Sequence, residues 1–323
     1  MPAPRVVSLL PSATESLCHI GGEELLVGRS HECDTPVTVK DRPVLTSQTT
    51  TFATSAEVDR AVSDALNSGT PLYRLDTHRV QELRPDVILT QDLCAVCSID
   101  LKTVRKLAAE MNPAPAVVSL NPTTFEDVLD DLITIGRAVG LEDQASDALI
   151  ALRQRFFAAS DFVNPYATVG SVVFLEWTDP PFIGGHWTPQ LIERAGATHP
   201  LNATVPMEGA GSGAGGQMAH RTAGKSVRVP PEAVAALDPD HIIICPCGLD
   251  LAHTRREANA LMQQPWFASL RAVRNNRVAL VDGNQMFNRP GPRLVDAYEW
   301  LVGWLNDVPR LIPDGFPWEP LTR

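Results

Sequence analysis

Apolar segments in the first 122 residues alternate between short runs typical of strands and longer runs with helical spacing. The expected strands cover residues 6–10, 25–28, 87–89 and 116–120, and helices are expected near 12–20, 77–83 and 101–111. A stretch without a clear pattern precedes Tyr73. Strands that alternate with helices are typical of a mostly parallel sheet with right-handed crossovers. The pattern predicts an α/β lobe over residues 1–122.

Residues 123–165 show helical spacing without a strand. Phe125, Val128 and Leu132 recur at helical intervals, and a second helical run covers 143–159. Since strands lie on both sides of this segment, we predict a helical linker between two lobes.

The second half repeats the alternation. Strands are expected at 172–175, 240–245 and 277–281, and helices at 188–195, 230–237, 255–263 and 294–305. The Gly/Ala-rich stretch 209–224 predicts a loop in which His220 is solvated. We predict a C-terminal α/β lobe over 166–306 and a Pro-rich tail, 307–323, that wraps the surface.

Polar and aromatic residues gather where the predicted strands end. In the densest stretch, 171–189, the apolar run is followed by Glu176, Trp177, His186 and Trp187 among prolines and glycines. Comparable clusters follow other strands: Ser12, Thr14 and Glu15; Arg29, His31 and Glu32; Gln91 and Asp92; Asn284, Phe287, Asn288 and Arg289. Because ligands bind outside the carboxyl ends of strands in open α/β sheets, these residues are candidates for a binding cleft.

Several of these residues also fit structural roles. Ser12 and Glu15 match a capping box with Ser12 as N-cap, which is compatible with ligand binding because a helix N-terminus presents free N–H groups. Arg29 with Asp34 would make a structural ion pair. Arg289 and Arg293, close to Asp296, would pair at the start of the last helix.

Charge and apolar run lengths exclude several classes of partner. A formal net charge of −11 argues against nucleic acid, whose binding begins with neutralising phosphates. No apolar run approaches the ~20 residues of a membrane span. Residues 6–10 are shorter than the ~7–15 residues of a signal-peptide core. We therefore expect a cytoplasmic protein without membrane insertion, whose six cysteines are reduced thiols.

Four motifs carry a resemblance to a known family. VVSLLPSATE, VGRSHECD, PDVILTQDLCAVC and RPGPRLVDAYEWL resemble the periplasmic-binding-protein family for iron–siderophores and vitamin B12, and more narrowly its cobalamin-binding subgroup. The resemblance covers roughly residues 5–305. It implies an α/β two-lobed clamshell joined by a helical spine, with one ligand bound between the lobes and no catalysed reaction. It also implies an ABC importer permease as partner, although exported members carry a signal that this sequence does not show.

A corrinoid suits the residues at the strand ends. It is a broad, partly apolar disc rimmed with amides, and its hosts are aromatic faces with a few fixed hydrogen-bonding groups. Trp177, Trp187 and Phe287 would supply the faces. Donors and acceptors would come from Ser12, Gln91, Asp92, Glu176, Asn284 and Asn288. We expect cobalamin, a similar corrinoid or a related metal chelate as the ligand.

Two alternatives stay open at this point. A zinc or iron site would use Cys33, Cys94, Cys97 and Cys247, with His31, His186 or Cys245 to complete it, because Cys94-x-x-Cys97 has the spacing of half such a site. Cys245-x-Cys247 does not match the spacing of a second ligand pair, because strand alternation would point both thiols to the same side of the strand. An acid–base enzyme using His186 with Glu176 lacks an identifiable nucleophile, and the sequence has no GxSxG elbow, P-loop or GxGxxG motif.

Overall fold

The computed structural model describes residues 2–49, 54–68, 72–92, 99–208 and 221–322. The chain forms two compact units. Unit 1 comprises Met1–Thr51, Ala61–Pro122 and Glu126–Arg153, and unit 2 comprises Phe52–Arg60, Thr123–Phe125 and Gln154–Arg323. No helix among the described residues is long and apolar enough to cross a membrane.

Unit 1 is built on a four-stranded parallel sheet in the order β2-β1-β5-β6. Its elements are β1 (Val6–Ser8), α1 (Pro11–His19), η1 (Glu23–Leu25), β2 (Leu26–Arg29), η2 (Val37–Asp41), β3 (Thr46–Gln48), β4 (Tyr73–Leu75), α3 (Thr77–Leu83), β5 (Val87–Thr90), α4 (Leu101–Ala109), β6 (Ala116–Ser119) and α5 (Phe125–Val139). The helices α2 (Ser55–Ser68) and α6 (Glu142–Ser160) each have residues in both units, and the first residue of α5, Phe125, belongs to unit 2.

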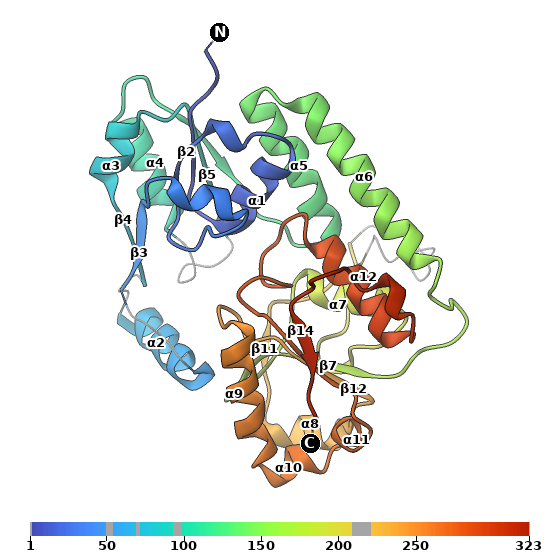
Figure 1. Cartoon of the computed structure of the whole chain (residues 1–323). Coiled ribbons are helices and arrows are strands. Elements are labelled where there is room, and N and C mark those ends of the chain that lie inside the picture. Colours follow the sequence, from blue (N-terminus) through green and yellow to red (C-terminus); the bar gives the residue numbers. More distant parts are fainter. Residues whose placement is uncertain (1, 50–53, 69–71, 93–98, 209–220, 323) are drawn as a thin grey trace. The chain divides into compact units, whose positions relative to one another are not determined.

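Alternation along the strands gives the sheet of unit 1 two apolar faces. Val7 and Ile88 pack with Val80 of α3 and Val104 of α4, so these helices cover one face. Figure 1 shows α5 on the opposite side of this sheet from α3 and α4. The chain goes from β1 to β2 on one side and later to β5 on the other. The loops after β1 and β5 therefore diverge, which is the switch point where open sheets bind ligands.

Unit 2 is built on a six-stranded mixed sheet in the order β11-β8-β7-β12-β13-β14. Its elements are β7 (Val172–Thr178), β8 (Pro181–Ile183), α7 (Trp187–Arg194), η3 (Pro200–Asn202), β9 (Val205–Pro206), β10 (Arg221–Thr222), β11 (Val227–Arg228), α8 (Pro231–Leu237), β12 (His241–Ile244), α9 (Leu251–Met262), α10 (Pro265–Ala268), α11 (Arg271–Arg274), β13 (Val278–Val281), α12 (Leu294–Leu305), η6 (Pro309–Leu311) and β14 (Trp318–Pro320). Strands β7, β12 and β13 are parallel to one another.

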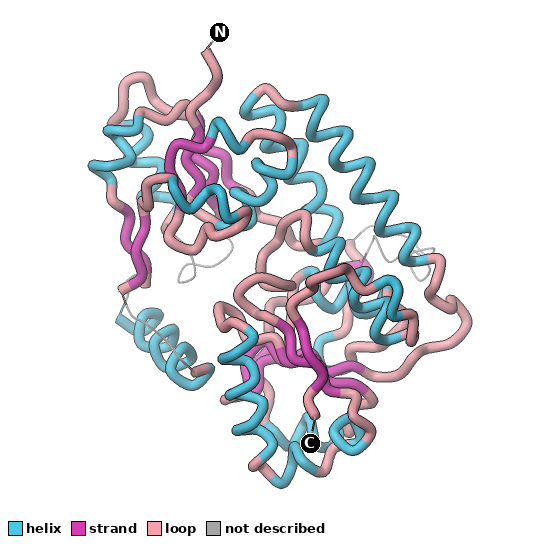
Figure 2. The backbone as a smooth tube through the Cα atoms, viewed as in Figure 1, coloured by secondary structure: helices cyan, strands magenta, loops and turns pink. Residues whose placement is uncertain are grey.

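Helices cover both faces of this sheet as well. Leu175, Ile242 and Leu280 pack with apolar residues of α8 to α11 in one buried cluster. On the other face, Phe174 meets Phe287, which in turn packs against Trp300 of α12. Figure 2 shows the magenta strands of unit 2 with cyan helices on either side. The predicted α/β class is confirmed, and so is the parallel sheet of unit 1; in unit 2 only β7, β12 and β13 are parallel, while the pairs at both edges of the sheet are antiparallel.

The predicted helices of the linker are present as α5 and α6, and the boundary between the two units lies within α6, after Arg153. The predicted last helix, 294–305, is confirmed without a shift. Several core strands shift by one residue, as when Leu25 belongs to the 3₁₀ turn before β2.

Three local predictions are wrong. Ser12 is not an N-cap: Leu10 occupies that position without a side-chain bond, and Pro11 starts α1 because its missing N–H costs nothing there. Strand β7 does not end at Leu175 but runs to Thr178 and turns into a hairpin with β8. The tail adds β14 to the edge of the sheet, and its buried Phe316 stacks on Trp300 at 5.2 Å, so the tail contributes a residue to the core.

The stretch without a clear pattern contains α2 as an insertion between the paired strands β3 and β4. The first turn of α2 is held within unit 2. Its Ser55 amide donates to the buried carboxylate of Glu257 at 3.3 Å, and Asp59 pairs with Arg228 at 3.4 Å. These partners are far apart in sequence, which is why local spacing does not predict them.

Candidate ligand-binding site

In unit 2, backbone hydrogen bonds join the segments that follow three parallel strands. The amide of Cys247, after β12, donates to the carbonyl of Glu176 in β7 at 3.0 Å. The amide of Gly248 donates to the carbonyl of Gly283, after β13, at 3.2 Å. A Cβ on Gly283 would lie 1.9 Å from the carbonyl oxygen of Pro246, so only glycine allows this approach. The predicted strand-end residues of unit 2 thus share one edge of the sheet.

Glu176 occupies a β-bulge near the carboxyl end of β7. Leu175 pairs with Ile183 and Trp177 with Phe182, which leaves Glu176 without a partner on β8. The half-buried carboxylate accepts hydrogen bonds from the Ser226 hydroxyl and from the amide of Gly185. Burial raises the pKa of Glu176, and these two bonds oppose the rise. Trp177 follows, half-buried, with its ring centroid 6.3 Å from that of Phe182.

A tight turn after β8 presents His186. Its backbone has φ 56° and ψ −121°, and its amide donates to the carbonyl of Gly224 at 2.9 Å. Its half-buried ring lies 5.5 Å from that of Trp187. Burial first, and then the charge of Lys225, lower the pKa of His186, so the imidazole is neutral at pH 7.

Trp187 and Phe287 have structural roles in this conformation. Trp187 is only 7% exposed, and its indole N–H donates to the carbonyl of Phe287 at 2.7 Å. Phe287 is 1% exposed and packs on Phe174 with ring centroids 5.1 Å apart. Of the three aromatic side chains predicted as ligand faces, only Trp177 presents a partly exposed ring.

The loop after β13 is held by side-chain to backbone bonds. The side-chain amide of Asn288 donates to the carbonyls of Gly283 at 2.8 Å and Cys245 at 3.2 Å. The carboxylate of Asp282 accepts from the amides of Asn284 and Gln285, each at 3.0 Å, while burial raises its pKa. Arg289 is buried, and the nearby Arg293 donates to the side chain of Gln285. The polar groups of this loop therefore serve mainly to hold the loop together and to the end of β12.

In unit 1, Arg29 organises the loop after β2. Arg29 is 9% exposed, and its guanidinium donates to the carbonyls of Ser30, Cys33 and Lys40 at 3.0–3.1 Å. Three fixed carbonyls around a buried cation indicate a structural role for Arg29, which the sequence analysis placed among the ligand contacts.

His31 and Glu32 follow Arg29 and are half-buried. The Nδ1 atom of His31 lies 2.7 Å from the hydroxyl of Thr46, while its buried Nε2 has no partner among the described residues. Burial and Arg29 lower the pKa of His31, against an opposing effect of Glu32. The hydroxyl of Tyr73 donates to Glu32 at 3.3 Å.

The other predicted residues of unit 1 lie at the ends of β1 and β5. Ser12, Thr14 and Glu15 are buried in α1, and the Thr14 hydroxyl donates to the Cys33 thiol at 3.0 Å. Gln91 is half-buried after β5, and the amide of Asp92 donates to the side chain of Asn121 at 2.7 Å.

The cysteine site finds no support among the described residues. No group of three or more His, Cys, Asp or Glu side chains there is arranged to hold a metal ion. Cys94 and Cys97 lie outside the described residues. Cys245 and Cys247 both follow β12, which ends at Ile244, so strand alternation does not relate them. Cys245 is buried and its pKa is raised, which makes it inert, whereas Cys247 is half-buried.

Several residues of these clusters were not predicted from the sequence. Ser226 and Lys225 reach the β7–β8 hairpin through the pairing of β11 with β8, and Thr46 and Tyr73 reach His31 through β3 and β4. Strand pairing between distant segments, not local spacing, brings them in.

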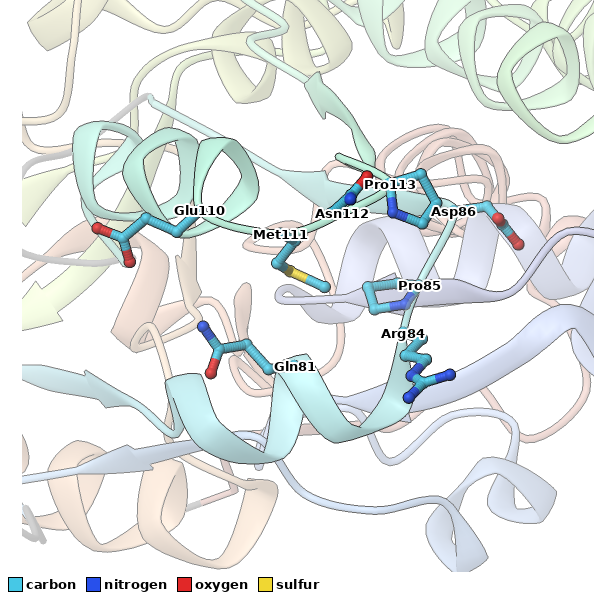
Figure 3. Close-up of a pocket in the computed structure, with 8 residues that line it drawn as sticks. All are labelled: Gln81, Arg84, Pro85, Asp86, Glu110, Met111, Asn112 and Pro113. Atoms are coloured by element: carbon cyan, nitrogen blue, oxygen red, sulfur yellow. The ribbon is translucent and has the colours of Figure 1, made fainter.

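A cavity of about 200 Å³ lies at the opposite edge of the unit 1 sheet (Figure 3). It is lined by residues that precede β5 and β6, including Arg84, Asp86 and Glu110. Because it faces the amino ends of these strands, it is separate from the predicted ligand residues.

These observations define the class: an α/β protein of two units whose polar and aromatic side chains gather at the carboxyl ends of mostly parallel strands. The chain belongs to the family described as periplasmic binding protein, which it matches over residues 6–284. That membership makes it a ligand-binding protein rather than an enzyme. No curated protein sequence matches this one.

Solved structures share the fold at low sequence identity. A periplasmic heme binding protein from Pseudomonas aeruginosa is 22% identical, with a TM-score of 0.67, over 99% of this chain and 95% of that one. The periplasmic vitamin B12 binding protein BtuF of Vibrio cholerae is 18% identical, with a TM-score of 0.65, over 96% and 99%. The periplasmic heme-binding protein RhuT from Roseiflexus sp. RS-1 is 19% identical, with a TM-score of 0.65, over 95% and 99%.

Proposed function

We propose that this protein binds a cobalamin-like corrinoid, or a closely related metal-chelating macrocycle, at the carboxyl ends of its strands. The observation that carries the proposal is the β7–β8 hairpin. Glu176, Trp177 and His186 are each half-buried there, on a backbone fixed by strand pairing and two close glycine contacts. A flat ring, a carboxylate and a neutral imidazole on a rigid frame match a disc rimmed with amides around a metal.

The related structures support the same class of ligand. Two are named as heme binding proteins and one as a vitamin B12 binding protein, and all share the fold of this chain. Heme and cobalamin are both metal-centred macrocycles. We favour the corrinoid because the four sequence motifs resemble the cobalamin-binding subgroup.

Titration of the purified protein with hydroxocobalamin, hemin and a ferric siderophore tests the proposal. Calorimetry and visible absorbance should show one corrinoid bound per chain with a Kd below about 10 μM. Trp177→Ala should weaken binding at least tenfold, since an aromatic face dominates such contacts. Tyr166→Ala is the matched control, because Tyr166 is an aromatic residue 96% exposed in a loop.

The outcomes separate the candidate ligands. Saturable binding of hemin without binding of cobalamin would replace the corrinoid with heme. No binding of any macrocycle at high micromolar concentration would overturn the proposal.

We also propose an importer permease as the partner, on the strength of the family alone. Co-purification of the tagged full-length chain with membrane proteins of its host tests this. Fractionation of the same cells tests the cytoplasmic location expected from the sequence.

A further inference from the structure

The backbone of His186 adopts a conformation that usually requires glycine. The amide of Thr188 donates to the carbonyl of Gly185 at 3.1 Å, which closes a four-residue turn. His186 is the second residue of this turn, with φ 56° and ψ −121°. These are the values of a type II′ turn, whose second position is dominated by glycine because a Cβ is strained there.

The surrounding structure holds this strained backbone in place. A Cβ on Gly185 would lie 2.4 Å from the backbone of Lys225 and Ser226, so Gly185, the residue before His186, packs directly on the segment that precedes β11. The amide of His186 is bonded to Gly224, and the next residue, Trp187, is anchored by its indole N–H. The turn is fixed by its neighbours and would keep its shape with glycine at position 186.

Among the described residues, no contact gives the imidazole of His186 a structural role apart from its packing on a neighbouring ring. It makes no capping bond to α7, and neither ring nitrogen has a hydrogen-bond partner among them. Its contact is with the ring of Trp187. It is half-buried and neutral at pH 7, which is the form of histidine that coordinates metals. Strained residues that packing does not require cluster at ligand sites.

We propose that His186 coordinates the cobalt of the bound corrinoid through one imidazole nitrogen, as an axial ligand. This rests on the proposed function and narrows its ligand class to cobalt corrinoids with an exchangeable axial position. The nitrogen lone pair forms the coordinate bond, the axial water leaves, and the cobalt keeps its oxidation state. Cyanide holds that axial position too tightly for imidazole to displace it, so cyanocobalamin does not form this bond there.

The test compares hydroxocobalamin, whose axial water exchanges, with cyanocobalamin. The wild-type protein should bind hydroxocobalamin at least tenfold more tightly. Its visible spectrum should shift to that of hydroxocobalamin mixed with excess imidazole in the same buffer. His186→Gly should abolish the spectral shift and lower the affinity for hydroxocobalamin to the affinity that the same variant has for cyanocobalamin. Because glycine suits the turn, the melting temperature of His186→Gly should equal or exceed that of the wild type.

His78→Ala is the matched control, since the side chain of His78 is 81% exposed in α3 and should change neither readout. His186→Gln separates coordination from hydrogen bonding: if it keeps the tenfold preference, the coordination proposal is wrong. Equal binding of both cobalamins by the wild type would also overturn it while leaving corrinoid binding intact. Failure to bind either cobalamin would instead remove the proposed function.

Discussion

The polar clusters that follow β2 in unit 1 and β7 in unit 2 look alike in sequence but serve different purposes. After β2, the chain folds around the guanidinium of Arg29, and Cys33 is fully buried. After the bulge in β7, the chain continues as a hairpin, which leaves Glu176, Trp177 and His186 partly exposed. A cluster that closes on its own cation is structural, whereas one displayed on a paired strand is available to a ligand.

The two units should also differ in their response to acid, and this is the largest effect we expect. His199 and His241 of unit 2 are buried, and burial lowers the pKa of each from 6.5 to about 4. Between about pH 4 and 6.5, these two histidines therefore bind protons in the unfolded chain but not in folded unit 2. The free energy of unfolding should therefore fall as pH drops from 6.5 to 4, by roughly 3 kcal/mol per histidine.

Tryptophan fluorescence measures this transition in unit 2 alone, because all six tryptophans belong to it. His241→Phe is the informative variant. Within the described part of the chain, neither ring nitrogen of His241 makes a hydrogen bond of standard geometry, and its ring packs edge-on against Trp304 at 5.4 Å. Phenylalanine should keep that contact and remove about half of the acid sensitivity. An unchanged pH profile in His241→Phe would assign the acid response to other groups.

The next effect tests the structural reading of the β2 cluster. Arg29→Ala leaves three carbonyls without their donor and should lower the free energy of unfolding of unit 1 by about 3 kcal/mol. Urea unfolding followed by circular dichroism should show this loss. The same unfolding followed by tryptophan fluorescence, which reports on unit 2, should keep its midpoint. Arg79→Ala, at an exposed arginine of α3, serves as the control and should change stability by less than about 0.5 kcal/mol. If Arg29→Ala were as stable as the wild type but bound the ligand more weakly, Arg29 would be a ligand contact, and the β2 cluster would not be structural.

A smaller effect separates the two tryptophans of the hairpin region. Trp187→Phe removes the donor of a buried 2.7 Å bond to Phe287 and should cost about 1–2 kcal/mol. Trp177→Phe keeps a ring in a half-buried position and should cost less than about 0.5 kcal/mol. Thermal unfolding of the two variants gives both values. If Trp177 proves the costlier position, its ring belongs to the core and not to the ligand surface.

The sequence predicted the α/β class, most strands and helices, and the collection of polar residues at the strand ends. Those features depend on local spacing and on the rule that parallel strands share an edge. It did not predict which members of each cluster are buried. Phe287 and Trp187 bury their rings because α12 and the β13 loop pack on them, and Arg29 is enclosed by a loop that closes eleven residues later, at Lys40. Long-range packing of this kind leaves no local periodicity.

The hairpin shows the same limit in finer detail. The abrupt change after Leu175 resembles a strand end, yet residues 176–178 stay in the strand because β8 pairs with Trp177 and Thr178 across the Asp179–Pro180 turn. Ser226, which bonds Glu176, directly precedes β11, and that strand of two residues is too short to give a pattern in the sequence. His186 carried a signal in the sequence, since it follows two glycines, but the need for a positive φ was visible only in the structure.

The smallest effect concerns the carboxylate of Glu176. The pKa of Glu176 in the folded protein is raised above 4.5. Between pH 4.5 and that raised pKa, the folded state therefore holds a proton that the unfolded chain has released. The contribution of this group to stability is therefore lost as pH rises above 4.5, through the raised pKa. Glu176→Gln has no such proton, and glutamine can still accept a hydrogen bond from Ser226. We expect Glu176→Gln to show a smaller fall of the unfolding free energy as pH rises across that window, a change of less than about 1 kcal/mol at pH 7, and a severalfold loss of corrinoid affinity. A loss of stability at pH 7 above 2 kcal/mol would make Glu176 a structural residue like Arg29 and remove the difference between the two clusters.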